Sequence, residues 1–172
     1  ERERGIVTAS AGNHGQGVAL ASKACGTQCT VFASDHAAPV KIDAMKKLGA
    51  KVILVNGGYV DAEKAAIQYS NETKKTFISP YNDVQVIAGQ GTIALEIIEK
   101  FTEFETVKSL LVPTGGGGLI CGIGSAIDER RARPRLVGVQ SDASSYAYQL
   151  LSTGSQEGVV ERDSVAEGLA GE

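Results

Sequence analysis

The sequence has few of the features that mark several protein classes. Its three cysteines, Cys25, Cys29 and Cys121, are an odd set without CxxC spacing, which predicts neither a disulfide framework nor a zinc site. We expect Cys25 and Cys29 to be packing residues, as free cysteines usually are. No apolar run has the length of a membrane span, and the first residues lack the order of a signal peptide. A cytoplasmic protein without membrane contact is therefore expected.

Clustered positive charge is also missing. The net charge is -3, and no run of Lys or Arg is longer than two residues. Nucleic acids and anionic membranes attract proteins through such clusters, so we expect no nucleic-acid partner. The 172 residues are 42% hydrophobic and 22% charged, which is ordinary for a globular protein with a substantial core.

Short β-branched segments alternate with longer helical patterns along the chain. Strands are predicted at residues 5–10, 30–34, 51–55, 75–79, 109–113 and 135–140. Helices are predicted at residues 16–24, 39–50, 60–74 and 91–101, with another after the glycines at 115–118. This order predicts an α/β fold with open, mostly parallel sheets and helices on both faces. The Pro-containing loop at 79–83 predicts a boundary between a complete small domain, residues 1–83, and part of a large one, residues 84–172.

Two glycine-rich segments each lie between a predicted strand and a predicted helix, at residues 8–17 and 114–118. In open α/β sheets this position is the carboxyl edge, where ligands bind and helix N-termini present N–H groups to anions. Four consecutive glycines, Gly115 to Gly118, can surround a phosphate with backbone amides. Anion binding is therefore predicted at both segments, with a hinge or tight turn as the alternative for the second.

Neither segment matches a nucleotide-binding motif. A Gly-x-Gly-x-x-Gly fingerprint would need glycine at Leu20, Ile120 or Cys121. A Walker loop needs a Gly-Lys pair, and the chain contains none. The predicted phosphate ligand is therefore not recognised through a dinucleotide or Walker motif.

Five segments resemble those of one enzyme family, in the same order. They are TASAGNHGQGVALAS (8–22), KIDAMKKLGAKVILV (41–55), VIAGQGTIALEI (86–97), VPTGGGGLICGI (112–123) and VAEGLAG (165–171). Together they resemble the pyridoxal-phosphate-dependent serine/threonine dehydratases, or threonine ammonia-lyases, of the tryptophan-synthase-β-like group, fold type II. The resemblance implies pyridoxal 5'-phosphate (PLP) as the cofactor. It also implies β-elimination from L-threonine or L-serine, which yields a 2-oxo acid and ammonia.

The resemblance also implies roles for individual residues. The substrate carboxylate is expected at Ser10, Gly12, Asn13 and His14, with Asn13 also contacting the cofactor ring, although His14 has helix capping as an alternative role. The cofactor phosphate is expected at Gly115, Gly116, Gly117 and Gly118, and the cofactor ring near Gly168. Tyr81 is expected either at the substrate cleft or in a packing role. The substrate loop would thus lie in residues 1–83 and the phosphate loop in residues 84–172, in an enzyme that forms a dimer or tetramer.

Several positions depart from the family pattern. The lysine that forms the Schiff base lies upstream of the serine loop in relatives, so we expect it outside this chain and expect the chain alone to be inactive. Ala11 stands where serine racemases have a second serine, and alanine has no proton to give. Gln140 and Tyr146 replace the carboxylates of metal-activated relatives, so no metal site is expected. A serine racemase or related 3-hydroxy amino acid dehydratase is one alternative, and a non-catalytic ligand-binding module is another.

Overall fold

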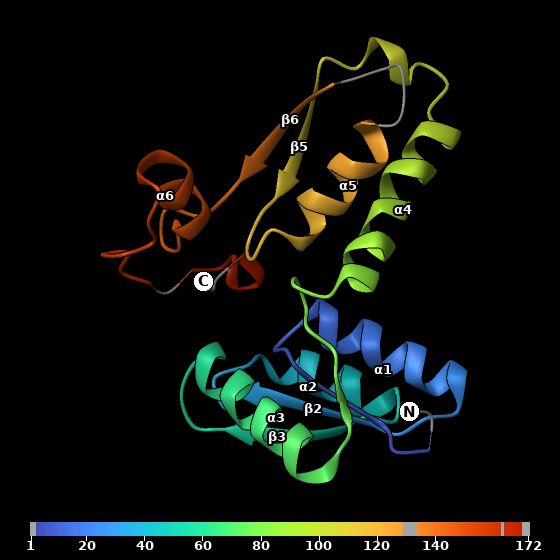
Figure 1. Cartoon of the computed structure of the whole chain (residues 1–172), viewed down its shortest axis with the longest axis vertical. Coiled ribbons are helices and arrows are strands. Elements are labelled where there is room, and N and C mark those ends of the chain that lie inside the picture. Colours follow the sequence, from blue (N-terminus) through green and yellow to red (C-terminus); the bar gives the residue numbers. More distant parts are fainter. Residues whose placement is uncertain (1–2, 129–133, 163, 170–172) are drawn as a thin grey trace. The chain divides into compact units, whose positions relative to one another are not determined.

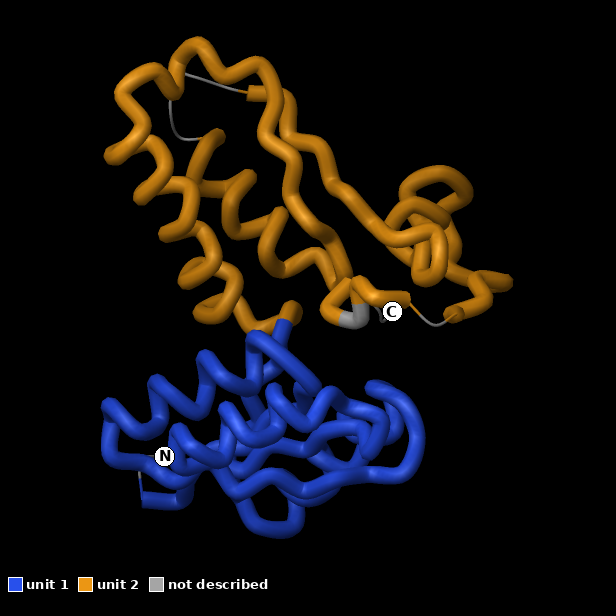
Figure 2. The backbone as a smooth tube through the Cα atoms, turned by 180° about the vertical axis from the view of Figure 1, so that it is seen from behind, with its two compact units in different colours: residues 1–80 blue, residues 81–172 orange. Residues whose placement is uncertain are grey.

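The chain forms two compact units in a computed structural model that describes residues 3–128, 134–162 and 164–169. Unit 1 is Glu1–Pro80 and unit 2 is Tyr81–Glu172 (Figure 2). The structure thus divides the chain before Tyr81, whereas the sequence pattern places the boundary after Asp83. Within the described ranges, no helix is both long and apolar enough to cross a membrane.

Unit 1 is a parallel sheet with helical crossovers. Its strands are β1 (Ile6–Ala9), β2 (Cys29–Ser34), β3 (Lys51–Val55) and β4 (Thr76–Phe77), and its helices are α1 (Asn13–Cys25), α2 (Pro39–Lys47) and α3 (Tyr59–Thr73). The strand order is β3-β2-β1-β4 and all pairs are parallel. The prediction of parallel strands linked by helices is confirmed here.

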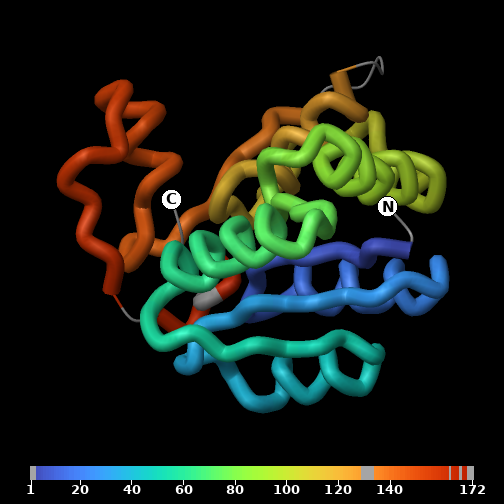
Figure 3. Tube along the Cα trace, turned by 60° about the horizontal axis from the view of Figure 1, so that its bottom comes forward, coloured from blue at the N-terminus to red at the C-terminus, as the bar shows by residue number. Residues whose placement is uncertain are grey.

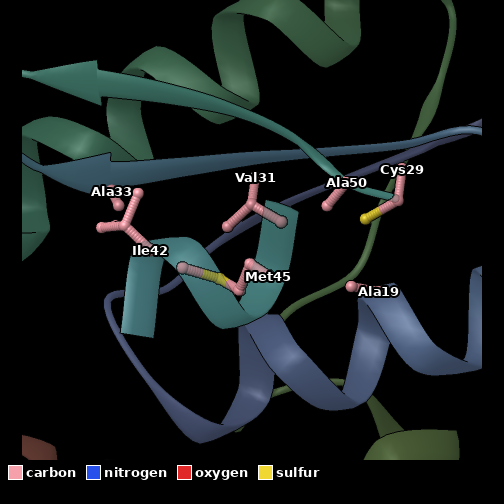
Figure 4. Close-up of a cluster of buried hydrophobic side chains, with 7 residues drawn as sticks. All are labelled: Ala19, Cys29, Val31, Ala33, Ile42, Met45 and Ala50. Atoms are coloured by element: carbon pink, nitrogen blue, oxygen red, sulfur yellow. The ribbon is translucent and has the colours of Figure 1, made fainter. Parts of the chain in front are cut away.

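Both faces of the unit 1 sheet are covered, because apolar side chains of the central strands point alternately to either side. On one face, Val31 and Cys29 of β2 pack with Ala19 of α1 and with Ile42 and Met45 of α2 (Figure 4). On the other face, β1 and Phe32 of β2 pack against α3. Figure 3 shows α2 and α3 on opposite sides of these strands.

The cysteines separate into buried and exposed positions. Cys29 lies in the core between β2 and the helices α1 and α2, and burial raises the pKa of its thiol, although a hydrogen bond with Ser22 acts in the opposite direction. The packing prediction is thus confirmed for Cys29. It is wrong for Cys25, which is exposed at the end of α1.

The described part of unit 2 contains a parallel strand pair and three α-helices. The strands are β5 (Ser109–Pro113) and β6 (Arg135–Val139), and the helices are α4 (Val84–Lys100), α5 (Gly118–Asp128) and α6 (Tyr146–Thr153). A core that includes Val112, Ala94 and Ile123 joins β5 to α4 and α5, which lie on the same side of the strand pair in Figure 1. Leu111, adjacent to Val112 in β5, is 66% exposed.

Two helices of unit 2 differ from the sequence prediction. Helix α4 begins at Val84, well before the predicted start at Gly91, because the Asp83 carboxylate accepts the N–H groups of the first turn. Gly91 lies inside the helix, where its backbone closely approaches the Gly122 carbonyl of α5. Helix α6 was not predicted, although the glycine at its end, Gly154, has the left-handed φ of 78° that is typical of a helix C-terminus.

Candidate functional site

The first glycine loop follows β1, one of the two central strands of the unit 1 sheet. The Ser10 N–H donates to the Phe32 carbonyl at 2.9 Å, which continues the pairing of β1 with β2. Helix α1 begins three residues later, at Asn13. The loop therefore lies at the carboxyl edge of the sheet, next to the backbone N–H groups of the first turn of α1.

The Ser10 side chain stabilises this loop through a hydrogen bond. Its side chain is buried, with 8% of the residue exposed, and Oγ accepts the Gly12 N–H at 3.1 Å. A hydroxyl that accepts in this way still has its own hydrogen to donate. Gly12, the residue before the helix, contributes no side-chain cap. The loop can thus offer hydroxyl and amide donors to a carboxylate.

Gly15 permits close packing behind the loop. A β-carbon at this position would lie 3.3 Å from both the Ser10 Cβ and a Val31 methyl, and it would overlap the sulfur of Met45. A larger residue would displace the buried Met45 side chain and crowd Ser10 and Val31. The glycine that follows His14 therefore permits this close packing.

His14 contacts the interior of unit 1. Its Nε2 lies 2.9 Å from the Thr8 hydroxyl and 3.4 Å from the Ile78 carbonyl. The Thr8 hydroxyl donates to the same carbonyl at 2.7 Å. Asn13, beside His14, is exposed at the first position of α1. Thr8 was not among the predicted site residues, because nothing in the local pattern indicates its link to Ile78.

A cation also lies near this loop. The Lys41 ammonium nitrogen is 3.8 Å from the position that a β-carbon on Gly12 would occupy. Lys41 belongs to the first turn of α2, which begins at Pro39. A positive charge there favours an anion at the loop. Lys41 was not among the predicted site residues. The signal that could have identified it is that the loops after β1 and β2 must share one edge of a parallel sheet.

The second glycine loop follows β5 in unit 2. Thr114 continues the strand pairing, since its N–H donates to the Val139 carbonyl at 2.8 Å. Gly117 has φ of +87°, which L side chains rarely adopt, and α5 begins at Gly118. A left-handed residue before a helix start directs successive N–H groups toward one point, and such concave backbones bind phosphate.

Two positions of the same loop, Gly116 and Gly118, have little room for a side chain. A β-carbon on Gly116 would lie 2.6 Å from the Tyr81 ring, and one on Gly118 would lie 2.9 Å from the Tyr81 Cα. Gly115 approaches the 3₁₀ turn η2 (Glu167–Leu169), where the Gly168 carbonyl is 3.6 Å from its β-carbon position. The structure thus brings Gly168 close to the four-glycine loop and packs Tyr81 against it. This cradle fits a phosphate bound by backbone groups.

The loop after β6 is joined to α6 through Gln140. Its Oε1 accepts the Tyr148 N–H at 3.0 Å. Its Nε2 is buried and has no hydrogen-bond partner in the described part of the chain. Tyr146, the second position that departs from metal-activated relatives, is buried. Among the residues that the structure describes, no cluster of three His, Cys, Asp or Glu side chains could bind a metal; the expected lack of a metal site stays a prediction.

The predicted residues fall into two groups. The four predicted substrate residues all belong to the loop after β1 and the start of α1, in unit 1. The predicted phosphate residues and Gly168 belong to unit 2. Each group is internally consistent with anion binding, and the two roles stay predictions at the level of single residues.

Known proteins are similar to this chain in sequence and in fold. The chain is 42% identical to L-threonine ammonia-lyase of Thermotoga maritima (strain ATCC 43589 / DSM 3109 / JCM 10099 / NBRC 100826 / MSB8) over 170 residues, which is 99% of the chain and 42% of that protein. It is 40% identical to L-threonine ammonia-lyase of Geobacter sulfurreducens (strain ATCC 51573 / DSM 12127 / PCA) over 97% of the chain and 41% of that protein. The chain therefore spans about two fifths of the length of these curated relatives.

Solved structures agree with this result. The processed form of threonine deaminase isoform 2 from Solanum lycopersicum matches with a TM-score of 0.84 and 32% identity, over 98% of this chain and 48% of that one. Maize serine racemase matches with a TM-score of 0.82 and 29% identity, over 97% and 50%. A family model described as "Pyridoxal-phosphate dependent enzyme" matches residues 1–172. The chain, whose two glycine loops follow parallel strands β1 and β5, belongs to the pyridoxal-phosphate-dependent enzyme family.

Proposed function

We propose that the protein to which this chain belongs converts L-threonine, and L-serine, to a 2-oxo acid and ammonia by PLP-dependent β-elimination. L-threonine would give 2-oxobutanoate and L-serine would give pyruvate. The observation that carries the proposal is the 42% identity, over 99% of this chain, to a protein named L-threonine ammonia-lyase. The geometry of the two loops supports it, because each offers donors to one of the two anionic groups that the reaction needs.

The loop after β1 is proposed to bind the substrate carboxylate. The donors would be the Ser10 hydroxyl and the backbone N–H groups of the first turn of α1, at Asn13 and His14, beside Gly12. The partial positive charge of a helix N-terminus favours a carboxylate. Lys41, whose ammonium lies beside Gly12, adds a full positive charge. The carboxylate would be oriented by this set of groups, and the rest of the amino acid would be directed away from the helix.

The loop after β5 is proposed to bind the cofactor phosphate through the backbone N–H groups of Gly115 to Gly118. Support comes from the left-handed Gly117 and the start of α5 at Gly118. When bound, PLP supplies an electron sink for the charge that develops at the substrate α-carbon. Gly168, near Gly115, would adjoin the cofactor ring, and Asn13 would donate to a ring oxygen.

Ala11 favours elimination over racemisation. Racemisation requires a group that returns a proton to the opposite face of the α-carbon, and a methyl group cannot do so. The maize serine racemase shares the fold at 29% identity, so racemase activity is the competing function. Ala11 is the residue of this chain that separates the two.

The test uses the gene product that contains this sequence, purified with PLP. We expect it to form 2-oxobutanoate from L-threonine and pyruvate from L-serine, with no D-serine accumulating. Formation of D-serine as the main product would favour racemisation. No product from either amino acid, in protein that binds PLP, would favour a non-catalytic binding protein.

Borohydride reduction followed by peptide mapping locates the lysine that carries the cofactor. We expect the label outside these 172 residues. A label on Lys41 or another lysine of this chain would contradict the expectation that the chain contains no catalytic lysine. A cytoplasmic location and a dimeric or tetrameric state are part of the same proposal and are measured on the same preparation, by fractionation and by light scattering.

A further inference from the structure

A partly buried chain of hydrogen bonds joins Thr8, His14 and Ile78 next to the proposed substrate loop. Thr8, in β1, is completely buried. Its hydroxyl lies 2.7 Å from the Ile78 carbonyl and 2.9 Å from Nε2 of His14. Ile78 is distant in sequence from Thr8 and His14, and the pairing of β1 with β4 places it beside Thr8, since the Ile78 N–H donates to the Val7 carbonyl at 2.8 Å.

The heavy-atom distances assign the hydrogens. A threonine hydroxyl has one hydrogen, and a carbonyl has none. The Thr8 hydrogen must point to Ile78, because two oxygens at 2.7 Å without a hydrogen between them would repel. The hydrogen in the Thr8–His14 contact then belongs to Nε2 of His14. The 3.4 Å distance from Nε2 to the Ile78 carbonyl agrees, since that carbonyl can only accept.

We propose that Thr8 is a positioning residue for the substrate loop: it keeps the His14 proton on Nε2 and attaches the ring to the interior of unit 1. This inference rests on the proposed function and refines it. The neutral form of the imidazole has a single N–H, and in that form the contacts of Nε2 direct it to Thr8 and Ile78. The His14 side chain therefore does not donate to the substrate carboxylate. His14 contributes through its backbone N–H and through the orientation of the loop.

Removing the hydroxyl tests the proposal. Thr8→Val keeps the shape of a buried β-branched side chain and leaves Nε2 without its near acceptor, whereas Thr8→Ser keeps the hydroxyl. We expect Thr8→Val to lower kcat/KM for L-threonine about five- to tenfold, mainly through KM, which is the size of one lost hydrogen bond. Thr8→Ser is expected to restore most of the loss. Thr30→Val is the matched control, because Thr30 is a buried threonine on the neighbouring strand β2.

A spectroscopic measurement is independent of activity. In protein labelled with ¹⁵N-histidine, the His14 ring signals are those that disappear in His14→Gln. We expect the proton on Nε2 in the wild type and in Thr8→Ser, and a mixture of both tautomers in Thr8→Val. Thr30→Val is expected to leave the spectrum unchanged.

Three results would overturn the proposal. They are a proton on Nδ1 in the wild type, a spectrum and kcat/KM that Thr8→Val leaves unchanged, and an equal kinetic loss in Thr30→Val. A wild-type protein without activity toward L-threonine would refute the proposed function alone. In that case the tautomer in the wild type and in Thr8→Val still decides whether Thr8 positions the ring.

Discussion

The two glycine loops occupy equivalent places, yet they are stabilised in different ways. Polar side chains stabilise the loop after β1: Ser10 accepts the Gly12 N–H, and Thr8 of β1 lies 2.9 Å from Nε2 of His14. The loop after β5 is almost all backbone, packed against the Tyr81 ring and the turn that contains Gly168. Both loops precede a helix at the carboxyl end of a parallel strand.

The difference corresponds to what each loop is proposed to recognise. A phosphate presents equivalent oxygens in several directions, so backbone N–H groups suffice and side chains would only occupy space. An amino acid must be oriented about its α-carbon, and this requires side chains in defined positions. Backbone packing should therefore control the second loop, and individual polar side chains should control the first.

The largest effect is expected from a substitution that disrupts the packing of the loop after β5. In Gly118→Ala, the new β-carbon would lie 2.9 Å from the Tyr81 Cα, so the loop and Tyr81 must move apart. We expect the free energy of unfolding to fall by about 1–3 kcal/mol, and PLP to bind more weakly. Urea unfolding and an absorbance titration with PLP measure the two effects.

Gly124→Ala is the control for that variant. Gly124 is also in α5, but its β-carbon would make an ordinary 3.6 Å contact with Leu136. Because alanine favours helix, we expect no loss of stability and a gain of up to about 1 kcal/mol. Equal PLP affinity in the two variants would show that the close packing of Gly118 does not matter for the phosphate loop.

A smaller effect is expected from the first loop. Ser10→Ala removes the acceptor of the Gly12 N–H and one proposed donor to the substrate. We expect KM for L-threonine to rise about five- to tenfold, which is the size of one lost hydrogen bond. Ser22→Ala is the control, since the buried Ser22 hydroxyl donates to the Val18 carbonyl within α1. If both variants raise KM equally, the comparison between the loops is wrong.

A still smaller effect concerns the loops after β2 and β3. A hydrogen bond from Asn56 lowers the pKa of Asp35, and a backbone hydrogen bond from Gly57 acts in the same direction. A pKa that is lower in the folded state stabilises the protein above the unfolded value, near 3.8, and this stability is lost as pH falls through the folded pKa. We therefore expect Asn56→Ala to be slightly destabilising at neutral pH, with the difference disappearing in acid.

Urea midpoints across this pH range measure the Asn56 effect. The control is the Asp35→Asn background, which has no carboxyl group to titrate. In that background, Asn56→Ala should change stability by the same amount at every pH. A pH-independent difference in the Asp35 protein would contradict the assigned cause.

The last prediction is that added Mg²⁺ has no effect on the stability of the protein. Gln140 is a neutral amide whose Oε1 already accepts the Tyr148 N–H, and amides are weak substitutes for carboxylates around Mg²⁺. We expect added Mg²⁺ to leave Tm unchanged. A rise in Tm that saturates with Mg²⁺ concentration would reveal a cation site and contradict the prediction.

Much of the fold could be predicted from local pattern. All six predicted strands are present, because each is a short β-branched segment between turn residues. The start of α4 was misplaced, since Gly89 and Gly91 weaken the helical pattern. Only the tertiary structure shows that Gly91 lies where its backbone closely approaches α5. The short helix α6 was missed because eight residues carry little periodic signal.

By itself, the sequence determined the alternation of strands and helices and the location of both glycine loops, because hydrophobic period and glycine position are local properties. Only the tertiary structure decided what supports each loop. The contacts of Thr8 with Ile78, of Lys41 with Gly12 and of Tyr81 with Gly116 join residues far apart in the chain. Such contacts follow from strand order and helix packing, and no local pattern encodes a distance between distant segments.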